Sequence, residues 1–156
     1  MRNVLHIADM LKKQKKHLSF HTPGHKRAGG DITELSYSDN LMNPTGAIMR
    51  AEEDLARILH ADKSYILTDG STAGIFSMIY ALKTAGRTRL ALPAYCHASV
   101  KNACRAAGVQ TVECCARRER GIPVQPSADE LAAALQQADA LLLTSPDYYG
   151  FFAPLE

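Results

Sequence analysis

The sequence predicts an α/β fold, a three-layer sandwich built on a mainly parallel sheet. Two observations predict it. Segments with the 3.6-residue period of a helix alternate along the chain with short apolar segments typical of strands. The strand segments, such as 89–92 and 140–144, are apolar enough to be buried on both faces, as strands are when helices cover both sides of a parallel sheet.

The first part of the chain is expected to hold helices and loops. A helix is predicted at 3–16, where apolar residues recur on one face. Residues 21–30 are predicted to be a loop, because Pro23 prevents helix continuation and the glycines favour turns. A second irregular stretch reaches Asn43-Pro44-Thr45-Gly46, and helical spacing resumes from 47 to 59. We expect residues 1–45 to form one segment, and 46–156 the first part of a larger α/β domain.

The alternation of strands and helices begins after that. The predicted elements are a strand at 65–68, a helix at 73–85, a strand at 89–92, a helix at 97–107, a strand at 109–114, a helix at 128–138 and a strand at 140–144. Ser127 or Asp129 is expected near the cap of the last helix. The segment 145–150 then reads as a loop at the carboxyl end of a strand, where α/β proteins place ligands. The fold is expected to continue past Glu156.

Composition indicates an ordinary soluble globular protein. Of the 156 residues 46% are hydrophobic and 22% are charged, and the net charge is +2. Lysines 12, 13, 15 and 16 fall on the first predicted helix, and a solvated helix face is favoured there over a nucleic-acid or membrane patch. No stretch approaches the 18 or so apolar residues of a membrane span, and the N-terminus lacks a signal peptide's apolar core.

The four cysteines are expected to be reduced thiols, mostly small core residues. None forms a CxxC pair, and the adjacent Cys114 and Cys115 are poorly placed for an ordinary bridge. Reduced cysteines are typical of a cytoplasmic protein, which is the location we expect.

The sequence Asp69-Gly70-Ser71-Thr72 lies between a predicted strand and a predicted helix. Gly70 would allow close approach of the backbone, and the amides and hydroxyls of Ser71 and Thr72 would suit a phosphate dianion at the positive end of the helix. Alternatively, Ser71 or Thr72 only caps the helix. The charge of Asp69 would repel a phosphate unless this side chain points away.

A second candidate is His97, at the next strand-to-helix junction and at the same edge of the sheet as Ser71. Its ring could stack on an aromatic ligand, or it could simply be an exposed histidine in the first turn of a helix. His17, His21 and His25 are spaced by four, but Pro23 and Gly24 prevent one helix face from holding them as metal ligands. We expect no metal site.

Five motifs, in order, resemble the major domain of the ornithine/lysine/arginine decarboxylases, which have the PLP-transferase fold (fold type I). The matching segments are FHTPGHK at 20–26, DITEL at 31–35 with NPTG at 43–46, DGSTAG at 69–74, His97 with Ser99, and SPDYYG at 145–150. The resemblance implies the cofactor pyridoxal 5'-phosphate (PLP), which draws electrons from the substrate α-carbon when CO2 leaves. It also implies a homodimer or higher homo-oligomer in the full-length protein.

The resemblance also implies residue roles. Ser71 and Thr72 would hold the PLP phosphate with room provided by Gly70, His97 would stack on the ring, and Ser145 would complete the cofactor site. His21, Thr22, His25 and Lys26 would line the site for a basic amino acid.

Two family elements have no counterpart here, namely the aspartate of the "DEAHG" segment and the Schiff-base lysine of "S-x-HK". Both are expected beyond Glu156, so the chain alone is expected to be inactive. The sequence also departs from the motifs at Asp69, Ala94, Tyr95, Ala98 and Asp147, where the family has Asn, Arg, Asn, Lys and Thr. The alternatives are another PLP lyase of the same fold, or a non-catalytic paralogue that binds phosphate or a partner subunit.

Overall fold

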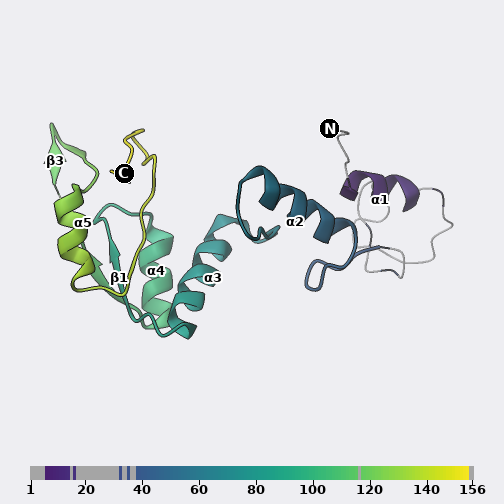
Figure 1. Cartoon of the computed structure of the whole chain (residues 1–156), viewed down its shortest axis with the longest axis horizontal. Helices are drawn as coiled ribbons and strands as arrows, with labels where there is room; N and C mark the ends of the chain where they lie inside the picture. The colour runs from purple at the N-terminus through teal and green to yellow at the C-terminus, as the bar shows by residue number, and fades with distance from the viewer. Residues whose placement is uncertain are drawn as a thin grey trace. The chain divides into compact units, whose positions relative to one another are not determined.

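The computed structural model describes residues 6–14, 16, 32, 35, 38–115 and 117–154. The chain divides into two compact units, Met1–Ile66 and Leu67–Glu156, which are described separately (Figure 1). The predicted division at residue 45 rests on sequence motifs and stays a prediction.

The first unit contains helices α1 (His6–Gln14) and α2 (Ala47–Ile58), within the predicted helical segments. His6 Nε2 lies 2.8 Å from a carboxylate oxygen of Asp54 and links the two helices. The N-terminus of α2 has no side-chain cap from Gly46. Instead the carboxylate of Asp39 accepts the backbone N–H groups of Thr45, Gly46 and Ile48, at 2.9, 2.9 and 2.7 Å. These are donors that a helix start otherwise leaves unpaired.

The strand predicted at 65–68 is wrong, because within the described part of the chain these residues pair with no strand. The backbone N–H of Ile66 donates to the side chain of Glu52 at 2.9 Å, so a carboxylate takes the place of a neighbouring strand. Tyr65 and Leu67 are 69% and 51% exposed. The residue types of this short apolar segment resembled a strand, but no described strand pairs with it.

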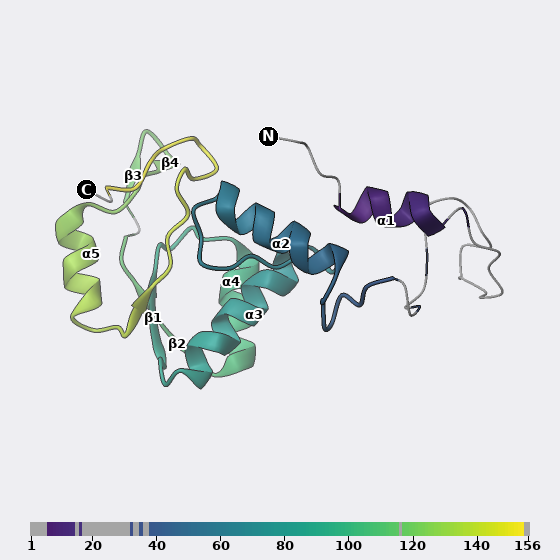
Figure 2. The ribbon, with the colours of Figure 1, turned by 45° about the vertical axis from the view of Figure 1, so that its right-hand side comes forward.

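The second unit is built on a small parallel sheet (Figure 2). Its elements are α3 (Gly70–Thr84), β1 (Arg89–Leu92), α4 (Ala98–Ala107), β2 (Gln110–Glu113), α5 (Ala128–Leu135) and β5 (Ala140–Leu141). The strand order is β2-β1-β5, and β1 is parallel to both neighbours. The predicted mixture of helices with a parallel sheet is confirmed at this level.

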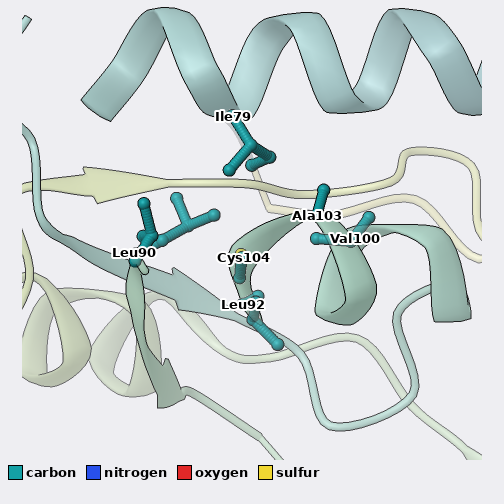
Figure 3. Close-up of a cluster of buried hydrophobic side chains, with 7 residues drawn as sticks. Ile79, Leu90, Leu92, Val100, Ala103 and Cys104 are labelled. Atoms are coloured by element: carbon teal, nitrogen blue, oxygen red, sulfur yellow. The ribbon is translucent and has the colours of Figure 1, made fainter. Parts of the chain in front are cut away.

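Alternate residues of β1 face different helices. Leu90 and Leu92 pack with Ile79 of α3 and with Val100, Ala103 and Cys104 of α4 (Figure 3). Ala91, between them, packs with Leu131 and Ala134 of α5. Side chains of a strand alternate between the two faces of its sheet, so helices cover both faces of β1.

The carboxylate of Asp139 joins the starts of β1 and β5. Its Oδ2 accepts the backbone N–H groups of Thr88 at 2.9 Å and Arg89 at 3.0 Å. The Asp139 N–H donates in turn to the Arg89 carbonyl at 2.8 Å. These hydrogen bonds set the register in which Leu90 lies opposite Ala140.

Two features of this unit differ from the prediction. Strand β5 is shorter than 140–144, because the carbonyl of Thr144 accepts from the side chain of Gln125 rather than from a strand. A hairpin of β3 (Arg118–Glu119) and β4 (Ile122–Pro123) was not predicted. Its turn has Arg120 and Gly121 both at positive φ, 51° and 84°, which is the backbone that two-residue hairpin turns of type I′ require.

All four cysteines are unpaired, and Cys104, Cys114 and Cys115 are buried, as predicted. Burial raises the pKa of the Cys104 and Cys114 thiols, which keeps them protonated. No helix in the described part of the chain has the length and apolarity needed to cross a membrane.

Candidate functional site beyond the strand ends

A pocket of about 660 Å³ lies beyond the carboxyl ends of β1 and β5. Because the two strands are parallel neighbours, the segments that leave them emerge at the same edge of the sheet. The segment after β1 contributes Pro93, Tyr95, Cys96 and His97, the segment after β5 contributes Thr144, Pro146, Asp147, Tyr148 and Tyr149, and the hairpin contributes Arg118 and Pro123. The structure thus brings His97 together with the loop that contains Ser145.

His97 is the N-cap residue of α4. Its Nδ1 accepts the backbone N–H of Ser99 at 3.2 Å and lies 2.7 Å from the Ser99 hydroxyl. An accepting Nδ1 carries no proton, so the neutral ring has its proton on Nε2. The capping role uses only Nδ1 and leaves the exposed ring as part of the pocket wall. The two interpretations of His97 are therefore compatible.

Tyr95 ties the segment after β1 to the segment after the hairpin. Its hydroxyl donates to the carbonyl of Val124. Burial is the main cause that raises the pKa of Tyr95 to about 12, with the negative charge of Asp147 among the smaller contributions. The phenol therefore stays a neutral donor at physiological pH. Next to it, the Lys101 ammonium donates to the Ala94 carbonyl at 2.8 Å.

The loop after β5 is organised by Asp147. Its Oδ1 accepts the backbone N–H groups of Tyr149 and Phe151, both at 2.9 Å, and its own N–H donates to the Phe151 carbonyl. The Ser145 hydroxyl accepts the N–H of Ala153 at 3.1 Å. The rings of Tyr148 and Tyr149 meet edge to face, with centroids 5.3 Å apart. Ser145 thus holds the loop, and its neighbours line the pocket.

Gly70, Ser71 and Thr72 form the first turn of α3, which begins three residues earlier than predicted. Gly70 has a φ of 74°, where any other residue is strained. The N-cap residue Asp69 makes no side-chain hydrogen bond to this turn. By contrast, α4 is capped by His97 and α5 by a capping box of Ser127 and Glu130. The first amides of α3 are therefore not taken up by a capping side chain.

The three residues Gly70, Ser71 and Thr72 are exposed and do not line the pocket. The structure therefore joins only part of the predicted site, namely His97 with the Ser145 loop. His21, Thr22, His25 and Lys26 lie outside the described residues.

Sequence reasoning missed Arg118 as a pocket residue, and it noted Tyr95 and Asp147 only as neighbours of the candidate residues and as departures from the motifs. The Arg120-Gly121 pair in front of Ile122 was the available signal for the hairpin that carries Arg118.

The small parallel sheet, with its pocket beyond the strand ends, defines a chain of the α/β class that has a cavity where this class binds ligands. The profile of the Orn/Lys/Arg decarboxylase major domain matches residues 7–155. The chain therefore belongs to the Orn/Lys/Arg decarboxylase family.

Curated relatives are similar at modest identity. Uncharacterized protein YaaO of Bacillus subtilis (strain 168) is 29% identical, with 99% of this chain and 36% of the relative aligned. An arginine decarboxylase of the same strain is 26% identical over 97% of this chain and 36% of its own length. An arginine decarboxylase of Bacillus cereus is 26% identical, with 89% of this chain and 35% of the relative aligned. The chain thus spans about a third of the length of these relatives, and no solved structure matches it.

Proposed function

We propose that this chain supplies the phosphate-binding and ring-binding part of a PLP-dependent decarboxylase that acts on a basic amino acid. The observation that carries the proposal is the first turn of α3 in a chain of this family. Gly70 takes a backbone conformation that suits glycine, and the helix start has no side-chain cap. Free N–H groups at a helix N-terminus, together with the helix dipole, favour a dianionic phosphate.

The residues fit the phosphate end of the cofactor. The amides of Ser71 and Thr72 would donate to the phosphate oxygens, and the two exposed hydroxyls would add further donors. The carboxylate of Asp69 at the N-cap opposes this binding, because its charge has the same sign as the phosphate. We therefore expect a weaker phosphate site here than one with a neutral residue at position 69.

His97 fits the ring of the cofactor. Its Nδ1 is fixed by two contacts with Ser99, which orient the imidazole in the pocket wall. A fixed ring stacks on an aromatic ligand at a smaller entropic cost than a free one. When bound, PLP supplies the electron sink for the charge that develops as CO2 leaves the substrate.

The proposal also covers the substrate, the assembly and the location of the complete protein. We propose a basic amino acid as the substrate, with His21, Thr22, His25 and Lys26 near it, and Ser145 on the cofactor side. The complete protein would have the three-layer sandwich, form a homodimer or higher homo-oligomer and work in the cytoplasm. The family membership and the names of the arginine decarboxylases support this proposal.

The test is a phosphate titration of the 15N-labelled chain followed by backbone amide signals. We expect saturable shifts at Gly70 to Ala73. The N-terminus of α5 provides a control inside the same molecule, because its capping box already occupies the first turn, so Ala128 and Asp129 should not move. Equal shifts at both helix starts, or none at α3, would contradict the proposed phosphate site.

A further inference from the structure

Asp147 lines the pocket, and its two carboxylate oxygens have different surroundings. Its Oδ1 is fully used by the N–H groups of Tyr149 and Phe151. Its Oδ2 is buried and has no hydrogen-bond partner among the described residues. A buried carboxylate oxygen without a donor costs on the order of 1–3 kcal/mol, or more because the group is charged. Such an oxygen calls for a missing partner, such as a water, an ion or a ligand.

The neighbouring groups that the structure describes do not supply that partner. Arg118 lines the same pocket, but its guanidinium donates to the Gly121 carbonyl at 3.0 Å. The ion pairs of the described residues include none between Arg118 and Asp147. The Tyr95 hydroxyl donates to Val124 instead. Among the described residues, no cationic side chain therefore pairs with the carboxylate of this pocket-lining residue.

We infer that Asp147 is a specificity-determining residue, which binds the ammonium or guanidinium group of a ligand in this pocket. A cationic group has several N–H donors and would give Oδ2 the charge-assisted hydrogen bond that it lacks. Tyr148 and Tyr149 line the same pocket, and the face of an aromatic ring also favours a cation. This inference rests on the proposed function, because it selects basic amino acids among its substrates.

The residue type at this position is informative. Position 147 holds a carboxylate, and a threonine there provides an uncharged comparison. A threonine hydroxyl carries no charge and would not attract a cation in the same way. We therefore expect this chain to bind cations more tightly at this point than its own Asp147→Thr variant.

The experiment titrates the 15N-labelled 156-residue chain with 1,5-diaminopentane and follows the amides of Tyr149 and Phe151. These N–H groups bond the other oxygen of the same carboxylate, so they report directly on Asp147. We expect saturable shifts with the diamine and none with 1,5-pentanediol, which has the same length without charge. Equal shifts with both compounds, or no shift with the diamine, would overturn the inference.

Asp147→Asn is the sharpest variant, because the amide oxygen keeps both backbone hydrogen bonds while the charge is removed. We expect at least a tenfold loss of diamine affinity in Asp147→Asn and in Asp147→Thr. Asp129→Asn is the matched control, since it removes one exposed carboxylate from α5 outside the pocket, and its affinity should be unchanged. Undiminished binding by both position-147 variants, with their loop signals still dispersed, would refute the role of Asp147.

The outcome is separable from that of the proposed function. The diamine titration requires neither phosphate nor PLP, and the phosphate titration at α3 requires no cation. A chain that binds the diamine but not phosphate would keep this inference and lose the proposed phosphate site. A chain that binds phosphate but not the diamine would keep the proposed phosphate site and lose this inference.

Discussion

The imidazole of His97 and the hydroxyl of Ser99 lie 2.7 Å apart, and the Ser99 N–H donates to the same ring nitrogen. One side chain thus caps α4 and lines the pocket. Capping can be separated from the proposed stacking on the cofactor, because capping needs only an acceptor while stacking needs the ring.

We predict that His97→Asn and His97→Ala have different effects. Asparagine is a good N-cap, so His97→Asn should unfold at nearly the wild-type urea concentration, whereas His97→Ala should lose about 0.5–2 kcal/mol of stability. Both variants should bind PLP several-fold more weakly, as measured by equilibrium dialysis. If His97→Asn retained full PLP affinity, the ring would have no role in binding.

We predict that Asp69→Asn strengthens phosphate binding at α3. The substitution removes a negative charge from the N-cap position and leaves a side chain that is accepted there. The dissociation constant from the amide titration should fall several-fold, most clearly at low ionic strength, because salt screens exposed charges. Asp62→Asn, in the exposed segment after α2, is the charge-matched control. An unchanged constant in Asp69→Asn would mean that the carboxylate points away from the anion.

We predict that Asp39 stabilises the first unit in a pH-dependent way. Burial alone would raise the pKa of Asp39, but hydrogen bonds from four backbone N–H groups outweigh it and lower the pKa to about 2. The unfolded carboxyl has its ordinary pKa of about 3.9, so the stabilisation is complete above that value and is lost as the pH falls toward 2.

Urea unfolding of wild type and Asp39→Ala at several pH values measures this. We expect a difference of about 0.5–2 kcal/mol at neutral pH, as for the loss of a helix cap. The difference should shrink between pH 4 and pH 2. A gap that stayed constant down to pH 2 would show that the charge of Asp39 contributes nothing.

We predict that none of the eight lysines of this chain becomes a stoichiometric PLP attachment site. No "S-x-HK" sequence occurs in the 156 residues. The Lys101 ammonium is held by the Ala94 carbonyl, and Lys83 lies 3.4 Å from the Gly108 carbonyl. Incubation with PLP, borohydride reduction and peptide mapping should give sparse labelling spread over surface lysines. One fully labelled lysine, accompanied by CO2 release from lysine or arginine, would disprove this.

The apolar segments made much of the fold predictable. Leu90 to Leu92 and the apolar face of α4 encode buried positions directly, and Ser127 with Glu130 encodes a helix start. The strand at 65–68 could not be excluded from sequence, because the partner of Ile66 is a side chain 14 residues away. Sheet pairing depends on such distant groups, which local patterns do not contain.

The sequence predicted the parts of the candidate site that lie in a motif. It did not predict the parts that only the tertiary structure brings together. His97 and Ser145 were predicted to share one edge because both follow parallel strands. Arg118 enters the pocket only through the hairpin, and the unpaired oxygen of Asp147 exists only because two backbone amides occupy the other one. The hairpin has only the Arg120-Gly121 pair as a signal, and the unpaired oxygen of Asp147 has no signature in the order of residues.

The clamp of Asp139 on Thr88 and Arg89 has a consequence for the order of assembly during synthesis. Thr88 and Arg89 lie 51 and 50 residues before Asp139 in the chain. The connection between β1 and β2 is shorter, because it contains only α4. Loops that are shorter close at a lower entropic cost, so β1, α4 and β2 can associate on the ribosome before Asp139 has emerged. Until then one edge of β1 is open to any other strand, and a nascent chain stalled before residue 139 would be the form most exposed to mispairing.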